Sequence, residues 1–125
     1  MPSLIDLATV RQSRGSLTVI EKILPFGVKR VFYIYDVPPG TSRGGHGHRK
    51  TRMALVALAG SCRISGPWES WAYRLDSPSS CLILDPEDWH DMLFETPGTI
   101  LLCLASEDFD ADDYVDEPPA KDSRP

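Results

Sequence analysis

Two histidines one residue apart, His46 and His48, lie in the stretch SRGGHGHRKTRMALVALAG, which has the composition of a strand. Side chains at i and i+2 of a strand project to the same face, so the two imidazoles converge on one volume, with Cβ atoms about 7 Å apart. Gly47 between them allows another backbone or side chain to approach the opposite face closely. Such a pair can bind a metal ion, move protons near neutral pH, or simply pack.

The two histidine segments resemble the motifs of the cupins: GGHGHRKTRMALVALAG the first motif, and LDPEDWH, which ends in His90, the second. In metal-binding cupins a Glu follows the histidine pair by a few residues and completes the ligand set. Residues 51–53 of this chain (Thr, Arg, Met) offer no carboxylate there, and the neighbouring Arg49 and Lys50 repel a divalent cation. We therefore predict proton chemistry without a metal or other cofactor. Three histidines alone can bind zinc, so a metal-binding cupin that acts on a small molecule stays an alternative.

The elements that must position these residues are almost all strands. Short segments rich in Val, Ile, Tyr, Phe and Leu alternate with turns that contain Pro and Gly, which is typical of a sandwich or barrel. We predict an all-β, cupin-type double-sheet jelly roll that forms a single domain over residues 1–116. The charged, Pro-rich residues 117–125 predict a flexible C-terminal tail. The predicted strands cover residues 16–21, 28–37, 52–65, 69–76, 80–85, 90–95 and 99–106.

Composition excludes several classes of function. The net charge of −5 and pI of about 5.0 argue against nucleic-acid binding, which normally requires a basic surface. The longest apolar run, residues 99–105, is far shorter than the ~20 residues that span a bilayer. The first residues show no basic region followed by an apolar core, so we expect no export, and the three cysteines lack the spacing of a disulfide framework. We expect reduced core thiols and a cytoplasmic protein.

The strand RVFYIYDV carries two further candidates. Its alternation places Val31, Tyr33 and Tyr35 on one face, opposite a face that is apolar except for Asp36. We interpret it as a strand between an outer packed layer and a ligand-lined interior, to which it presents two phenols.

Several motifs in order, SRGSLTVIE, LPFGVKRVFYIYDVP, RGGHGHRK, LAGSCRI, LDSP, WHDM and LASEDFDADDYV, resemble those of the cupin-type dTDP-sugar 3,4-ketoisomerases, the WxcM-like C-terminal family. The resemblance implies a homodimeric, metal-free isomerase that moves the carbonyl of dTDP-4-keto-6-deoxyglucose from C4 to C3. The product would enter deoxy-amino-sugar biosynthesis, for lipopolysaccharide, S-layer or antibiotic glycosides. An exposed edge of the SLTVIE strand would also favour a dimer.

The resemblance also implies roles for individual residues. We expect His48 to be the base at C3 and His46 its partner, with Tyr33 and Tyr35 relaying a proton or donating to the enediolate. Substrate-binding candidates are Arg14, Lys29 (or its neighbour Arg30), Arg43, Arg63, Trp89 and His90.

The positions of Arg14 and His90 resemble the family type that leaves C4 in the galacto configuration. Met53 stands where many relatives have a Gln. That departure keeps open a third function, a catalytically silent module that binds sugar nucleotides.

Overall fold

The structure is a computed structural model that describes residues 1–121. Within this range the chain forms strands and two short 3-10 helices, and no helix is long and apolar enough to cross a membrane. The elements are β1 (Ser3–Asp6), β2 (Ala8–Gln12), β3 (Gly15–Val19), β4 (Arg30–Ile34), β5 (Thr41–His48), β6 (Met53–Ala59), β7 (Cys62–Ser65), η1 (Pro67–Glu69), β8 (Ala72–Leu75), β9 (Ser80–Leu84), β10 (His90–Phe94), β11 (Ile100–Ala105), η2 (Ala111–Asp113) and β12 (Tyr114–Val115).

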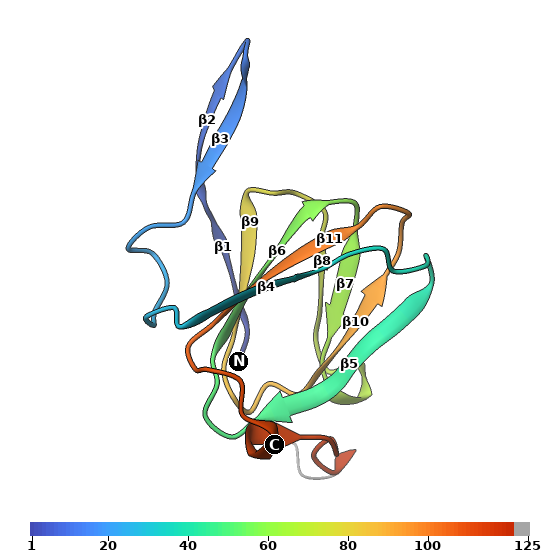
Figure 1. Cartoon of the computed structure of the whole chain (residues 1–125). Coiled ribbons are helices and arrows are strands. Elements are labelled where there is room, and N and C mark those ends of the chain that lie inside the picture. The colour runs from blue at the N-terminus through green and yellow to red at the C-terminus, as the bar shows by residue number, and fades with distance from the viewer. Residues whose placement is uncertain (122–125) are drawn as a thin grey trace.

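Two five-stranded sheets form the body of the molecule, in the orders β1-β9-β6-β11-β4 and β12-β5-β10-β7-β8 (Figure 1). Every strand pairing in the described part of the chain is antiparallel. This arrangement confirms the predicted all-β, double-sheet jelly roll of cupin type.

The main core fills the space between the two sheets. Leu55, Ile64, Phe94 and Leu101 are fully buried there, and each contributes about 2 kcal/mol by leaving water. A second apolar cluster lies on the outer face of the first sheet, where it is covered by a loop that contains Phe26. Phe32 and Ile34 of β4 pack against the main core, and β6 contributes buried residues to both clusters. The free cysteines Cys62, Cys81 and Cys103 are all buried, as expected.

Two strand predictions needed correction. The predicted strand over residues 52–65 is broken into β6 and β7 by a turn at Gly60, whose φ of +74° suits glycine. A Cβ on Gly60 would lie 2.4 Å from Oγ1 of Thr99, so the turn is also too crowded for a side chain. Residues 3–12, which we did not predict to be strands, form β1 and β2.

The hairpin of β2 and β3 is a separate two-stranded sheet that projects from the body; we call residues 8–19 the arm (Figure 1). Its apolar side chains are exposed, with Val10 at 52% and Leu17 at 59%. A lone two-stranded hairpin is marginally stable in water. The arm therefore has apolar surface that the other residues within 1–121 do not cover.

Of the predicted tail, residues 122–125 lie outside the described residues. Within the part that is described, the carbonyl of Pro119 accepts a hydrogen bond of 3.0 Å from Nε1 of Trp68.

Candidate active site

The end of β5 places His46 and His48 on one face, as the spacing predicted. Their ring centroids are 5.4 Å apart and the rings meet edge to face. On the opposite face, a Cβ on Gly47 would lie 3.3 Å from the carbonyl oxygen of Pro86 and 3.4 Å from Cα of Trp89. Glycine thus permits the close approach that was expected there, and the turn before β10 packs directly behind the pair.

His90 lies beside the pair, also as predicted, because β10 pairs with β5 and puts His90 opposite His46. The centroids of these two rings are 5.6 Å apart. Nδ1 of His90 is 2.8 Å from the carbonyl oxygen of Asp88, which can only accept, so Nδ1 carries the proton. Nε2 is then an acceptor, buried and without a hydrogen-bond partner among the described residues.

Burial keeps all three histidines neutral near neutral pH. It lowers the pKa of His46 and, together with the neighbouring His46 charge, lowers the pKa of His48 to about 4. Burial likewise lowers the pKa of His90 to about 4, although its hydrogen bond to Asp88 opposes the shift. An unprotonated imidazole can accept a proton from carbon. In the described part of the chain, no group of three or more His, Cys, Asp or Glu side chains is arranged to hold a metal ion.

The histidine pair opens onto a cavity of about 480 Å³. Strands β4 and β5 border it, together with the segment that follows β11. A cavity of this size accommodates a small organic ligand. Its lining residues are Arg30, Phe32, Tyr33, Ile34, Tyr35, Arg43, Gly44, His46, His48, Thr51, Met53, Met92, Ala105, Glu107, Asp108, Phe109, Asp110, Asp113 and Tyr114.

Two arginines, Arg30 and Arg43, supply the positive charge of this cavity, and neither forms an ion pair within residues 1–121. The guanidinium of Arg30 lies 4.4 Å from the ring centroid of Phe32. Lys29, our first choice, does not line the cavity; its Nζ lies 3.6 Å from a carboxylate oxygen of Glu107. The correction follows from strand alternation, because Arg30 and Lys29 are adjacent and project to opposite sides.

The faces of β4 are the reverse of our interpretation. Phe32 and Ile34 pack against the main core, whereas Tyr33 and Tyr35 are 61% and 57% exposed. The two phenol rings lie 5.7 Å apart at the border of the cavity. Alternation along the strand shows that β4 has two different faces, but it does not show which face points inward. In the structure the apolar face points inward, because its side chains are better buried there.

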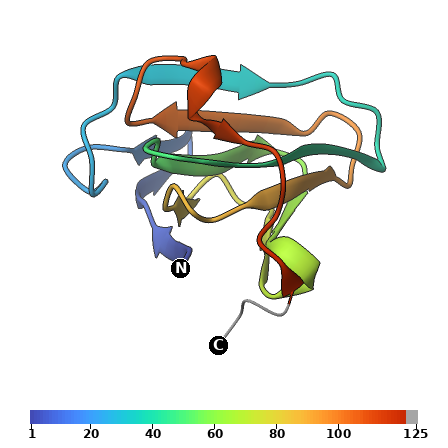
Figure 2. The same cartoon turned by 90° about the horizontal axis from the view of Figure 1, so that it is seen from below.

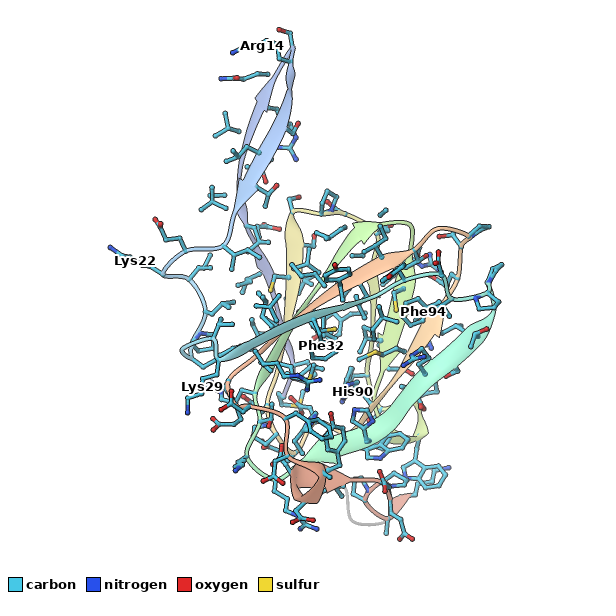
Figure 3. The ribbon with its side chains drawn as sticks, viewed as in Figure 1. Arg14, Lys22, Lys29, Phe32, His90 and Phe94 are labelled. Carbon is cyan, nitrogen blue, oxygen red and sulfur yellow. The ribbon has the colours of Figure 1, made fainter. Side chains whose placement is uncertain are left out.

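Four other candidates do not line the cavity of their own chain: His90, which is buried beside His46, and three that lie elsewhere. Arg14 is at the tip of the arm, far from His90 (Figure 3). Arg63 lies on β7 and pairs with Glu69 at 3.2 Å. Trp89 does not line the cavity either, and its Nε1 donates a hydrogen bond of 3.1 Å to the carbonyl of Asp116.

Tyr114 is a cavity residue that the sequence analysis did not single out. Its ring centroid is 4.8 Å from that of His46 and 4.9 Å from that of His48. The contact forms because β12 pairs with β5 and puts Tyr114 opposite His48. No local signal in the sequence indicates this pairing, which joins segments far apart in the chain.

Comparison with known proteins gives matches over nearly the whole chain. The model of the family described as FdtA, WxcM-like C-terminal, matches residues 1–120. A curated relative, the TDP-4-oxo-6-deoxy-alpha-D-glucose-3,4-oxoisomerase of Aneurinibacillus thermoaerophilus, is 38% identical over 115 residues, which cover 89% of this chain and 83% of the relative.

Solved structures give the same result. A mutant of the 3,4-ketoisomerase QdtA of Thermoanaerobacterium thermosaccharolyticum, in complex with TDP-4-keto-6-deoxyglucose, superposes with a TM-score of 0.87. It is 38% identical, and the match covers 93% of this chain and 87% of that one. A 3,4-ketoisomerase of Helicobacter canadensis has a TM-score of 0.87 at 30% identity, over 93% of this chain and 90% of its own.

Proposed function

The chain belongs to the FdtA, WxcM-like C-terminal family of sugar 3,4-ketoisomerases, and from this premise we propose that it isomerises TDP-4-keto-6-deoxyglucose to the 3-keto sugar without a metal. The observation that carries the proposal is the pair of neutral, half-enclosed imidazoles at the cavity. A ketone shift needs a base at C3, and these imidazoles are unprotonated near neutral pH. Relatives that are named for this activity match nearly the whole chain.

The reaction we propose moves one proton between neighbouring carbons. His48 takes the proton from C3, and the electron pair of that bond moves to the C4 carbonyl to form an enediolate. His46 holds the developing oxyanion and moves protons among the two oxygens and C4. Protonation at C4 then leaves the carbonyl at C3, so no oxidant or reductant is consumed. The hydroxyls of Tyr33 and Tyr35, at the border of the cavity, donate to the sugar oxygens.

Arg30 and Arg43 bind the diphosphate of the substrate in this proposal. Both residues line the cavity, neither has a carboxylate partner in the described chain, and arginine suits bidentate phosphate contact. Four acidic residues on the segment after β11 also line the cavity. Because they repel a diphosphate, we expect it to bind in the part of the cavity near the two arginines.

We propose the galacto configuration at C4 for the product, with Arg14 and His90 as the residues that select it. His90 supports this choice by its contact with His46, the partner in proton transfer. The product would then supply the synthesis of a 3-amino deoxysugar in the cytoplasm.

The test of the reaction is proton NMR of TDP-4-keto-6-deoxyglucose in D2O with chelator-treated protein. A 3-keto product with deuterium at C4 supports the proposal, and a small coupling between H4 and H5, read in H2O, supports the galacto configuration. Turnover only after metal addition would instead establish the metal-binding cupin. No turnover under either condition, with TDP still bound, would establish the silent binding module, for which Met53 at the cavity is the observation to follow.

We further propose that the protein is a homodimer in which the arm of each subunit packs on the other subunit. The exposed apolar residues of the arm need a cover, and the first sheet also exposes apolar side chains on its outer face. Among them, Val31 of β4 is 58% and Leu58 of β6 is 46% exposed. Exchange of the arms would carry Arg14 to the cavity of the partner, which explains why it lies far from its own.

Mixing two impaired variants tests this arrangement. In a mixture of Arg14→Ala and His48→Asn subunits, each heterodimer has one cavity with both native residues, so random pairing restores about a quarter of the sites. Refolding the two variants together should therefore recover activity that neither has alone. If Arg14 serves its own subunit, or if light scattering shows a monomer, no recovery will occur.

A further inference from the structure

The segment that follows β11 crosses from the first sheet to the second, where it ends in β12; we call residues 107–116 the strap (Figure 2). Several of its residues line the cavity, so the strap forms part of the wall over the histidine pair. Its position therefore affects how much water reaches the imidazoles.

Asp113 anchors the strap to the turn between β5 and β6. Its buried carboxylate accepts hydrogen bonds from the backbone N–H of Arg49 at 3.1 Å and of Lys50 at 2.8 Å, and from the hydroxyl of Thr51. Burial acts to raise the pKa of Asp113, but these bonds outweigh it and hold the pKa below its ordinary value. The anchor is thus an ionised, fully engaged group directly next to Tyr114.

The anchor determines where Tyr114 lies. With Asp113 fixed, β12 pairs with β5, and the ring of Tyr114 packs across both His46 and His48 at 4.8 and 4.9 Å between centroids. The phenol hydroxyl makes no hydrogen bond with the described residues. The ring, rather than the hydroxyl, accounts for the contacts that the structure shows.

We propose that Tyr114 is a positioning residue of the site, whose ring orients His46 and His48 and excludes water from their inner side. The role rests on the proposed ketoisomerase function. The burial of His48 that the ring provides is of the kind that lowers its pKa to about 4. The charged and titratable groups that face the two imidazoles from the packed elements are Arg30 on β4, His90 and Asp91 on β10, Asp113 on η2 and Asp116 after β12.

The test measures the imidazoles directly, by NMR titration of labelled histidine, alongside the pH dependence of kcat. Tyr114→Ala should raise the pKa of His48 by about one unit or more, toward 6.5, because water then reaches the imidazole. The acid limb of kcat should move upward with it, and kcat should fall about tenfold. Tyr114→Phe, which keeps the ring, should leave the titration and most of kcat unchanged.

Asp113→Glu provides a second route should the alanine variant fail to fold, because it keeps the carboxylate charge that raises the pKa of His48 but lengthens the side chain that anchors the strap. Loosening the anchor in this way should raise the pKa of His48, as Tyr114→Ala does, whereas the matched Asp112→Glu, on an exposed neighbour, should not change it. The proposal is overturned if Tyr114→Ala leaves the titration in place, or if Tyr114→Phe is as damaging as Tyr114→Ala. The titration needs no turnover, so it decides the role of Tyr114 in shielding even where the wild-type protein shows no isomerase activity.

Discussion

The cavity and the arm are opposite in how their own chain supports them. The histidine cavity is enclosed by strands of both sheets and by the strap, and its two imidazoles contact each other, His90 and Tyr114. The arm pairs only with itself and exposes Val10 and Leu17. The histidines are thus packed by their own chain, while the arm has the features of a surface that a partner would cover. In the proposed dimer, the histidines and arginines of one subunit would meet Arg14 from the arm of the other.

Changing the base tests the cavity most severely. His48→Asn should reduce kcat by about 10²- to 10⁴-fold, since the general base is lost while the ring space stays filled. Binding of TDP, measured by calorimetry, should remain within about threefold of the wild type, because the arginines are untouched. Retained turnover in His48→Asn would show that another group removes the C3 proton.

Replacing the exposed apolar residues of the arm tests its role as an interface. The double variant Val10→Asp and Leu17→Asp should convert the proposed dimer to monomers, because burying two carboxylates in its apolar interface would cost several kcal/mol. Light scattering measures the mass, and kcat/KM should fall about tenfold or more as each cavity loses the partner's arm. A dimer of unchanged mass would place the interface elsewhere on the molecule.

The buried histidines predict a pH dependence of stability. His48 and His90 have pKa values lowered to about 4 from an unfolded value of 6.5, so the unfolded state binds more protons between these pH values. The free energy of unfolding should therefore rise as the pH increases from about 4 to 6.5 and stay level above it. Urea unfolding across this range measures the slope, and His90→Phe should reduce it. If His90→Phe leaves the slope unchanged, the pH dependence of stability comes from other groups.

The smallest expected effect is a difference in TDP binding between variants of the neighbouring residues Arg30 and Lys29. Arg30→Gln should weaken TDP binding roughly tenfold, the amount of a charge-assisted contact. Lys29→Gln should change it less than about twofold, because Lys29 is exposed and already paired with Glu107. Calorimetry with TDP compares the two at one ionic strength. Equal losses would mean that the cavity attracts TDP by its overall charge and not through Arg30.

Much of the fold followed from patterns in the sequence. Period-two apolar runs and their turns indicated most strands, and the His-Gly-His spacing indicated two imidazoles on one face. The break at Gly60 and the strands β1 and β2 were missed, since a turn inside an apolar run and a short polar strand carry weak local signals. The orientation of β4 was reversed, because alternation is symmetric until packing chooses the inner face.

The sequence by itself determined the chemistry available to this protein: two imidazoles on one strand, a third after a turn, and no carboxylate at residues 51–53, where metal-binding cupins have a Glu. These features depend on spacing within a few residues, where strand geometry is nearly invariant. Only the tertiary structure decided which groups surround them. Arg30 rather than Lys29 faces the cavity, Tyr114 covers the histidines, and Arg14 stands away on the arm. Those placements arise from pairings between distant segments and from the burial of apolar surface, which a local pattern does not encode.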